Sequence, residues 1–430
     1  MLEKIFHLTK NNTSIRNEIL GGVTTFMTMA YILAVNPQIL SDAGMDKDAV
    51  FTATILASVV AMLVMALAAN LPIALAPGMG LNAFFAYTVV RGMGYSWETA
   101  LTAVFIEGIL FVIMSFFNIR EAIIKSIPVN LKYAISVGIG LFIAFNGLVN
   151  AGIIIGDPDT LVKIGDTTDP DVVLSLAGII IIGALLIFRI KGALLIGILL
   201  ITVLGLPFGI TQWPENSIIS KPPSISSTFL AIDFSTLLNP DILIVVFTFL
   251  FVDIFDTVGT LVGVCSRAKL LDEKGDVPKS KQALMADAIG TITGSLLGTS
   301  TVTSYIESAS GISAGGRTGM TTIVVAFLFL VSLFLYPLFS MVPGAATAPV
   351  LVIVGLFMIN PIRQIDLEDY SEAIPVFLTI IIMPLTLSIS EGIIVGMMTY
   401  VFLKVITGGW KQVSLVMYIL CAIFILKFIL

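Results

Sequence analysis

Long apolar runs recur along the whole of this 430-residue chain, for example at 23–40, 51–69 and 99–117. A helix needs about 20 apolar residues to cross the hydrocarbon core of a bilayer. Only 12% of the residues are charged, which is about half the share in soluble domains, and the mean hydropathy is +1.05. The runs do not alternate apolar and polar residues as the strands of a membrane β-barrel do. The sequence therefore predicts an all-α polytopic membrane protein.

Several classes of chemistry lack their residues. Cys265 and Cys421 are the two cysteines, too few for a disulfide framework or a zinc site. No HExxH, GxSxG or GxxxxGK[ST] motif occurs. An intramembrane aspartyl protease needs two facing aspartates, whereas Asp253 and Asp256 share one helix. We therefore expect no enzyme, no metal, no cofactor and no nucleic-acid partner.

The positive charges gather in alternate connections between the apolar runs, which indicates the orientation in the membrane. By contrast, the connection at 156–171 is acidic. Connections rich in Lys and Arg stay on the cytoplasmic side, and the first 17 residues show no removable signal peptide. We expect a cytoplasmic N-terminus. The basic residues are Lys4, Lys10, Arg16, Arg120, Lys125, Lys132, Arg189, Lys191, Arg267, Lys269, Lys274, Lys279 and Lys281.

Two segments do not read as ordinary spans. Residues 70–86 (NLPIALAPGMGLNAFFA) hold two prolines and two glycines, and residues 299–311 (TSTVTSYIESASG) are β-branched, then small and polar. Irregular backbone at membrane depth is tolerated only inside protein or along a cavity. Each segment predicts a short extended piece followed by a half-helix. The alternative is two chance breaks in unrelated helices.

The two broken segments occupy matching places in the two halves. Ala57 leads to Asn70 as Ala286 leads to Thr299, with the same offset of 229 (286 − 57 and 299 − 70). Paired interrupted segments at corresponding positions point to the binding site of a transporter. Seven spans in each half, an odd number, would invert the second half in the membrane.

Ionisable groups inside spans are costly and are therefore candidates for function. Glu307 lies at the second break, where a half-helix would begin, and a helix N-terminus stabilises a carboxylate. Its carboxylate could also accept hydrogen bonds from the ring N–H or amino group of a ligand. The alternative is a simple capping role. Because His7, the one histidine, precedes the first span, proton transfer within the membrane would have to use carboxylates.

Other polar residues in spans are weaker candidates. Asp256 lies on one helical face of 246–264, or alternatively joins two helices as a buried polar residue. Asp287 opens its span, or merely starts a helix near the membrane surface. Glu107 lies deep in an apolar segment without polar neighbours at helical spacing, and Asn82 could face the second broken segment across the repeat axis or be structural. The polar face of 246–264 comprises Asp253, Asp256, Thr257 and Thr260.

Four stretches resemble the AzgA-like purine permeases of the nucleobase-cation symporter-2 family, also called nucleobase-ascorbate transporters. They are GGVTTFMTMAYILAVNP (21–37), ALAPGMGLNAFFAYTVV (74–90), FVDIFDTVGTLVGV (251–264) and MADAIGTITGSLLGTSTVTSYIESASGISAGGRTG (285–319). The resemblance implies about 14 segments in two inverted repeats of seven, with short antiparallel strands in segments 3 and 10. It also implies a core domain that moves against a gate domain in an elevator-type cycle, coupled to proton symport.

The resemblance implies roles for particular residues. Glu307 and Asp256 match binding positions that also serve proton coupling, and Asp287 matches a coupling position. Ala288, where relatives often carry glycine, departs from the pattern, and the apolar run at 413–430 exceeds the 14 segments. The remaining pocket residues expected are Ser308, Thr257, the backbone at Leu75 and Ala76, Phe26 or Tyr31 stacking on the purine, and the supporting Asn82 and Thr260.

We expect proton-coupled uptake of purine bases through the cytoplasmic membrane, with guanine and hypoxanthine first and adenine second. The partners expected are the purine and membrane lipid, and a homodimer is left open. The alternatives are a sulfate-like anion transporter of the same architecture, a uracil or xanthine permease, or a channel. The expected units are core domain 17–127 and 240–342, gate domain 128–206 and 343–409, an extracellular loop at 207–239, and an extra hydrophobic helix at 410–430.

Overall fold

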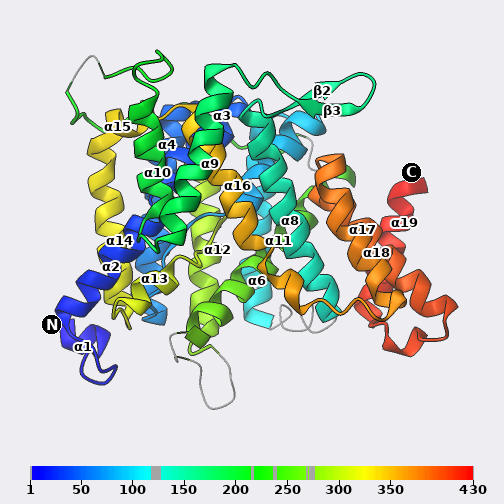
Figure 1. Ribbon diagram of the computed structural model, residues 1–430. Helices are drawn as coiled ribbons and strands as arrows, with labels where there is room; N and C mark the ends of the chain where they lie inside the picture. Colours follow the sequence, from blue (N-terminus) through cyan, green and yellow to red (C-terminus); the bar gives the residue numbers. More distant parts are fainter. Residues whose placement is uncertain are drawn as a thin grey trace.

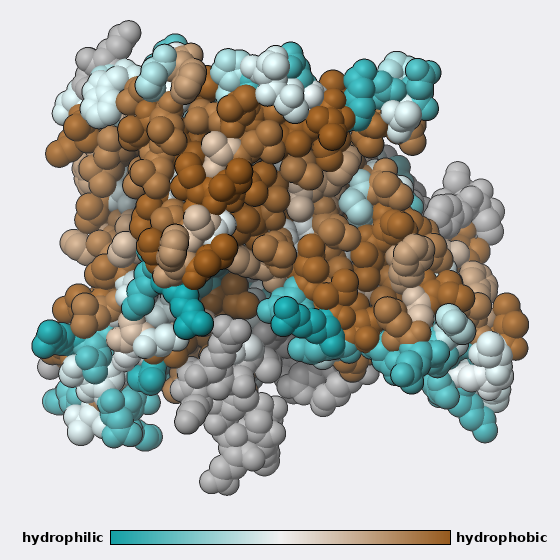
Figure 2. Space-filling view, viewed as in Figure 1, coloured by the Kyte–Doolittle hydropathy of each residue, from teal (hydrophilic) through white to brown (hydrophobic). Residues whose placement is uncertain are grey.

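The computed structural model describes residues 2–117, 127–214, 217–235, 240–267, 270 and 277–429. In these ranges, eight helices are long and apolar enough to cross a membrane. The helices run roughly parallel to one another (Figure 1), and Figure 2 shows a broad apolar belt with hydrophilic residues above and below it. The predicted helical membrane architecture is confirmed. Of the basic residues that indicated its orientation, Arg120, Lys125, Lys269 and Lys274 lie outside the described ranges.

The first half contains the first broken segment between two long helices. It continues into an extramembrane hairpin and two further helices. In chain order its elements are α1 (Leu2–Phe6), α2 (Ile15–Met29), α3 (Ile32–Asp42), α4 (Lys47–Val64), the π-helix η1 (Met65–Ala69), β1 (Leu75–Pro77), α5 (Met79–Ala83), the π-helix η2 (Phe84–Gly92), α6 (Trp97–Phe117), α8 (Val129–Asn150), β2 (Ile154–Asp157), β3 (Leu161–Ile164), α9 (Pro170–Ile187) and α10 (Ala193–Leu204).

The second half repeats this order from α11 onward, with its broken segment at β4 and α13. Its elements are α11 (Pro240–Arg267), α12 (Ser280–Leu297), β4 (Val302–Ser304), α13 (Ser308–Ser313), α14 (Gly319–Ser332), the 3₁₀-helix η3 (Leu333–Leu335), α15 (Tyr336–Ser340), α16 (Gly344–Met358), the 3₁₀-helix η4 (Asn360–Gln364), α17 (Tyr370–Thr386), α18 (Ile389–Ile406), the 3₁₀-helix η5 (Trp410–Gln412) and α19 (Leu415–Ile429).

The two broken segments meet as a two-stranded antiparallel sheet. Ala76 of β1 lies opposite Thr303 of β4, and the register runs from the Leu75–Ser304 pair to the Pro77–Val302 pair. Pairing supplies partners for backbone N–H and C=O groups that would otherwise lack them at membrane depth. The predicted strands in the third and tenth segments are therefore confirmed.

The helices pack in two groups. The sheet group surrounds β1 and β4 and consists of α2, α3, α4, η1, α5, η2, α6, α11, α12, α13 and α14. The flanking group consists of α8, α9, α10, α16, α17 and α18, with α19 against α18. The two groups touch where α5 meets α8, where α3 meets α16, where α2 meets α10 and where α11 meets α18.

The structure corrects one expectation about an element boundary. Asp287 does not open its helix, because α12 begins at Ser280. The preceding residues, SKQALMA, include several strong helix formers, so the helix extends beyond the apolar run. Within the first span, Ile15–Asp42, the helix is interrupted at Ala30 and Tyr31, between α2 and α3.

A β-hairpin, β2–β3, occupies the acidic connection and was not predicted. Lys163 lies 2.8 Å from Asp157 across it, and this ion pair with nearby backbone N–H groups lowers the pKa of Asp157 to about 2. The hairpin lies at the top of Figure 1, opposite the N-terminus. We call this face of the molecule the hairpin side.

Candidate substrate-binding site

Glu307 lies where strand β4 gives way to the half-helix α13. It occupies the N-cap position of α13, yet its side chain makes no capping hydrogen bond. The carboxylate instead accepts a hydrogen bond from the Tyr31 hydroxyl, with 2.8 Å between Oη and Oε1. The Thr28 hydroxyl donates to the Glu307 carbonyl at 3.4 Å. Glu307 is therefore oriented by a side chain of the first segment rather than by its own helix.

The interruption between α2 and α3 puts Tyr31 in reach of Glu307. Tyr31 takes the N-cap position of α3 and is 1% exposed. Helices α2 and α13 also lie very close together. A Cβ added to Gly311 would overlap with Thr25 Oγ1 and with the Gly21 carbonyl. A glycine at 311 is thus a steric requirement for the contact between Tyr31 and Glu307.

Asp256 approaches the same junction from helix α11. The Thr303 hydroxyl of β4 lies 3.5 Å from Asp256 Oδ2, and Asp256 is close enough to Glu307 for the two charges to interact. Asp256 and Glu307 are both half-buried, and Ile306, directly before Glu307, is 53% exposed. The structure therefore brings together the two carboxylates predicted from sequence and leaves their junction accessible.

Ser308, Leu75 and Ala76, which are predicted to line the pocket, bind other parts of the protein. Ser308 Oγ accepts a hydrogen bond from the Ala74 N–H at 3.0 Å, while Leu75 and Ala76 are fully buried and paired with β4. The Tyr305 hydroxyl donates to the Pro77 carbonyl at 2.6 Å. These contacts fix the sheet behind Glu307.

The two aromatic candidates have different surroundings. Phe26 is half-buried and meets the Phe329 ring edge-on, with 5.9 Å between the centroids. Tyr31 is enclosed and has its hydroxyl directed to Glu307. Of the two, only Phe26 retains an exposed part of its ring for a ligand.

Asn82 lies across the repeat axis from the second broken segment, as predicted. The Ser300 hydroxyl donates to Asn82 Oδ1, and Asn82 is completely buried. Among the described residues, no hydrogen-bond acceptor reaches its Nδ2. Asn82 therefore contacts Ser300, two residues before β4, rather than Glu307.

A second group of acidic residues, from α6, α11 and α12, is more deeply buried than Glu307 and Asp256. Asp253 and Asp287 are completely buried, and the Thr257 hydroxyl lies 3.1 Å from Asp253 Oδ1 and 3.1 Å from both Asp287 carboxylate oxygens. Glu107 of α6 is completely buried as well and accepts a 2.8 Å hydrogen bond from the Thr301 hydroxyl. Thr257 thus contacts buried carboxylates, and Thr260 is buried, 8% exposed.

Sequence reasoning missed Glu18. Its carboxylate is completely buried and accepts hydrogen bonds from the backbone N–H groups of Arg317 (2.9 Å), Thr318 (3.2 Å) and Thr321 (3.0 Å). These groups belong to the N-terminus of α14, so Glu18 caps a helix of the opposite repeat. The only signal in the sequence is a carboxylate shortly before an apolar run.

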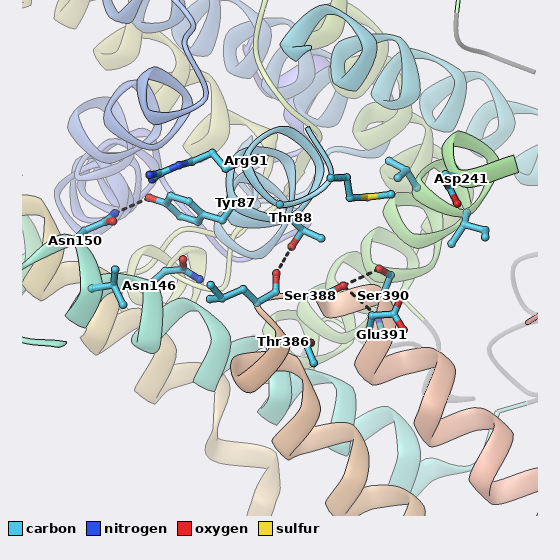
Figure 3. Close-up of a pocket in the computed structure, with 16 residues that line it drawn as sticks. Tyr87, Thr88, Arg91, Asn146, Asn150, Asp241, Thr386, Ser388, Ser390 and Glu391 are labelled. Carbon is cyan, nitrogen blue, oxygen red and sulfur yellow. Dashed lines mark hydrogen bonds between the residues drawn. The ribbon is translucent and has the colours of Figure 1, made fainter. Parts of the chain in front are cut away.

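One cavity between the helices does not contain Glu307 or Asp256. It has a volume of about 490 Å³ and opens on the hairpin side between η2, α8, α11 and the turn from α17 to α18 (Figure 3). On its walls, Asn150 donates to the Tyr87 hydroxyl at 2.6 Å, and the Thr88 hydroxyl donates to the Leu387 carbonyl at 2.8 Å. Both contacts join the sheet group to the flanking group.

A polytopic bundle with two broken segments meeting at half-buried carboxylates defines a membrane transporter. The permease family matches residues 16–395. The chain is 46% identical to guanine/hypoxanthine permease PbuG of Bacillus subtilis, covering 100% of this chain and 99% of that one. It is 45% identical to adenine permease AdeP of Escherichia coli, covering 100% and 96% respectively.

A solved structure shares the fold. The transmembrane domain of the cyanobacterial bicarbonate transporter BicA matches with a TM-score of 0.65 and 18% identity, covering 89% of this chain and 97% of that one. At this identity the likeness concerns the inverted-repeat fold alone. Together with the sequence matches, these findings show that the chain belongs to the permease family, and they confirm its resemblance to the AzgA-like members of nucleobase-cation symporter-2.

Proposed function

We propose that this permease takes up purine nucleobases across the cytoplasmic membrane by proton symport, with Glu307 as the principal binding residue. The observation that carries the proposal is the accessible junction at which Tyr31 orients Glu307 and Asp256 approaches from α11. The names of two relatives, an adenine permease and a guanine/hypoxanthine permease, support the substrate class.

The chemistry of the junction suits the edge of a purine. A carboxylate accepts hydrogen bonds. Guanine and hypoxanthine both carry an N–H in the six-membered ring, which adenine lacks there, and guanine adds an adjacent exocyclic amino group. A ligand that lacks these donors would leave buried acceptors unpaired, at a cost of about 1–3 kcal/mol for each group. We therefore place guanine and hypoxanthine ahead of adenine. Phe26, with its partly exposed ring, is the candidate to contact the purine face.

Two carboxylates at the junction argue against a sulfate-like anion transporter. An anion needs positive groups, whereas Glu307 and Asp256 bring negative charge to the place where the half-helix begins. The fold shared with a bicarbonate transporter does not favour this alternative, because the site rather than the fold decides the substrate. A uracil or xanthine permease remains the alternative that competition for uptake would reveal.

Proton coupling in this proposal uses Asp287, Asp256 and Glu307, and alternating access uses motion of the sheet group against the flanking group. The contacts of Asn150 with Tyr87 and of Thr88 with Leu387 bridge the groups on the hairpin side. We assign the hairpin side to the outside and the N-terminal side to the cytoplasm. With this assignment, the two contacts join the sheet group to the flanking group on the outer side of the protein.

Uptake of radiolabelled guanine, hypoxanthine and adenine in a host lacking its own purine permeases tests the proposal. We expect competition among purines, little competition by uracil, and loss of accumulation with a protonophore. Glu307→Gln should abolish uptake with normal amounts in the membrane, and Asp256→Asn should change the competition profile. Glu98→Gln, on the first turn of α6, is the control. Wild-type kinetics in Glu307→Gln would refute its role, and undiminished accumulation without a proton gradient would refute symport.

A further inference from the structure

The polar groups around Glu107 come from elements other than its own helix. It lies within the long apolar helix α6, is completely buried, and accepts one hydrogen bond, from Thr301 to Oε2. Among the described residues, no hydrogen-bond donor reaches the other oxygen, Oε1. Helix α11 packs against α6, and its Asp253 carboxyl is close enough to Glu107 for the two groups to interact. Two acceptor groups therefore face each other inside the sheet group.

Asp253 is in turn connected to Asp287. The Thr257 hydroxyl lies 3.1 Å from an oxygen of each residue, and it has a single proton to donate. Helices α6, α11 and α12 carry basic residues only at their ends, namely Arg267 and Lys281, and β4 carries none. The neighbourhood of Glu107 thus contains three carboxyl groups from three helices.

Two buried carboxyl groups in contact do not both stay ionised, because each charge opposes the other and neither is solvated. A proton bound by one of them supplies the donor that Glu107 Oε1 otherwise lacks. Such a proton is held by the pair rather than by either residue. A pair of this kind can bind one proton from water, which changes its charge from two negative units to one, and it can release that proton when water reaches the pair and solvates both charges.

We propose that Glu107 and Asp253 together bind the proton that is transported with the substrate, and that Thr257 connects this pair to Asp287. This inference rests on the proposed function and adds a proton site separate from the substrate carboxylates. Glu107 is a residue for coupling in this proposal, and it does not touch the purine.

The structure also links the proton pair to the substrate junction. Thr301, which binds Glu107, and Thr303, which meets Asp256, flank Val302 in the segment of β4. Asp253 lies one helical turn before Asp256 on α11, and their charges interact. Loading a proton on the pair removes a negative charge beside Asp256. Proton binding at Glu107 and substrate binding at Glu307 would therefore affect each other reciprocally.

The variant Glu107→Gln separates this role from substrate binding. Its amide can accept from Thr301 and donate to Asp253, so it imitates the protonated pair permanently. In proteoliposomes, we expect purine exchange without a gradient to continue at a rate close to wild type. Accumulation driven by a proton gradient should be lost, so that internal purine no longer exceeds external purine. Purine addition should also no longer cause proton uptake. Glu98→Gln, on the same helix, should leave all three measurements unchanged.

The outcomes distinguish the two proposals. Absence of purine exchange by the wild-type protein would refute the proposed function itself. Unchanged accumulation and proton uptake in Glu107→Gln would overturn the inference, and so would loss of exchange in a correctly folded variant, since Glu107 would then serve binding or structure. If Glu107→Gln does not reach the membrane, Glu107→Asp serves instead. We then expect the pH dependence of accumulation to shift with exchange retained, and an unshifted profile would contradict the proposal.

Discussion

The Tyr31 hydroxyl donates a 2.8 Å hydrogen bond to Glu307 Oε1, although 276 positions separate the two residues in the chain. The bond joins the interruption of the first membrane segment to the start of a half-helix in the second repeat. It fixes the rotamer of the Glu307 carboxylate. The candidate site therefore depends on both repeats.

Tyr31→Phe should weaken substrate binding without removing the protein from the membrane. A hydrogen bond to a charged group contributes about 1.5–3 kcal/mol, and loss of the lower value corresponds to about a tenfold change in affinity. We expect KM for purine uptake to rise accordingly with little change in the amount of protein. Tyr133→Phe, on α8 in the flanking group, is the matched control. Equal KM values for wild type and Tyr31→Phe would show that the hydrogen bond from Tyr31 to Glu307 does not contribute to substrate binding.

Gly311→Ala should disrupt the same contact by displacing α13. The added methyl group would overlap with Thr25 Oγ1 and the Gly21 carbonyl, so α13 and Glu307 would have to move away from Tyr31. We expect loss of purine binding, measured by equilibrium dialysis or calorimetry on the purified protein. Gly263→Ala on α11 is the control, because a Cβ there meets nothing within 4 Å. Wild-type binding by Gly311→Ala would mean that the helices can separate without consequence for the site.

A covalent link between residues 88 and 387 should stop transport reversibly. Thr88 Oγ1 lies 2.8 Å from the Leu387 carbonyl, across the boundary between the sheet group and the flanking group. If the groups move relative to each other, the double variant Thr88→Cys/Leu387→Cys should lose uptake on oxidation and regain it with a reductant. The single-cysteine variants control for Cys265 and Cys421, which are buried. Full uptake with the link closed would exclude relative motion at this contact.

Glu18→Ala should lower stability rather than selectivity. The substitution leaves backbone N–H groups of Arg317, Thr318 and Thr321 without their acceptor, at a cost of about 1–3 kcal/mol for each buried group that water does not reach. We expect a lower melting temperature in detergent and less protein in the membrane. The fraction that folds should compete for purines as wild type does. A changed competition profile at unchanged stability would place Glu18 in the binding machinery instead.

Sequence alone located the breaks and Glu307, because proline, glycine and a single charge inside an apolar chain are local signals. The matching offset also marked the two broken segments as a pair, and the family resemblance implied their antiparallel strands. By contrast, the partners of Glu107 come from α11, α12 and the approach to β4. Its helix shows no polar neighbour, so periodicity could not reveal the cluster.

Glu18 and Tyr31 illustrate a second limit of sequence reasoning. The three N–H groups that Glu18 binds follow about three hundred positions later, and no spacing rule joins them. The family resemblance predicts Phe26 or Tyr31 as the ring that stacks on the purine, but the break between α2 and α3 directs the Tyr31 hydroxyl to Glu307. Long-range packing, rather than local propensity, decided the surroundings of both residues.

The sheet formed by β1 and β4 also has a consequence for how the protein is made. Strand β1 belongs to the half of the chain that leaves the ribosome first, and its partner is synthesised only when residues 302–304 emerge. Until then, its backbone groups must be hydrated or held by the insertion machinery, because lipid offers them no partner. The binding site thus cannot assemble before residues 302–304 have been made. A nascent chain truncated before residue 302 would leave the backbone groups of β1 unpaired and exposed to the quality-control proteases of the cell.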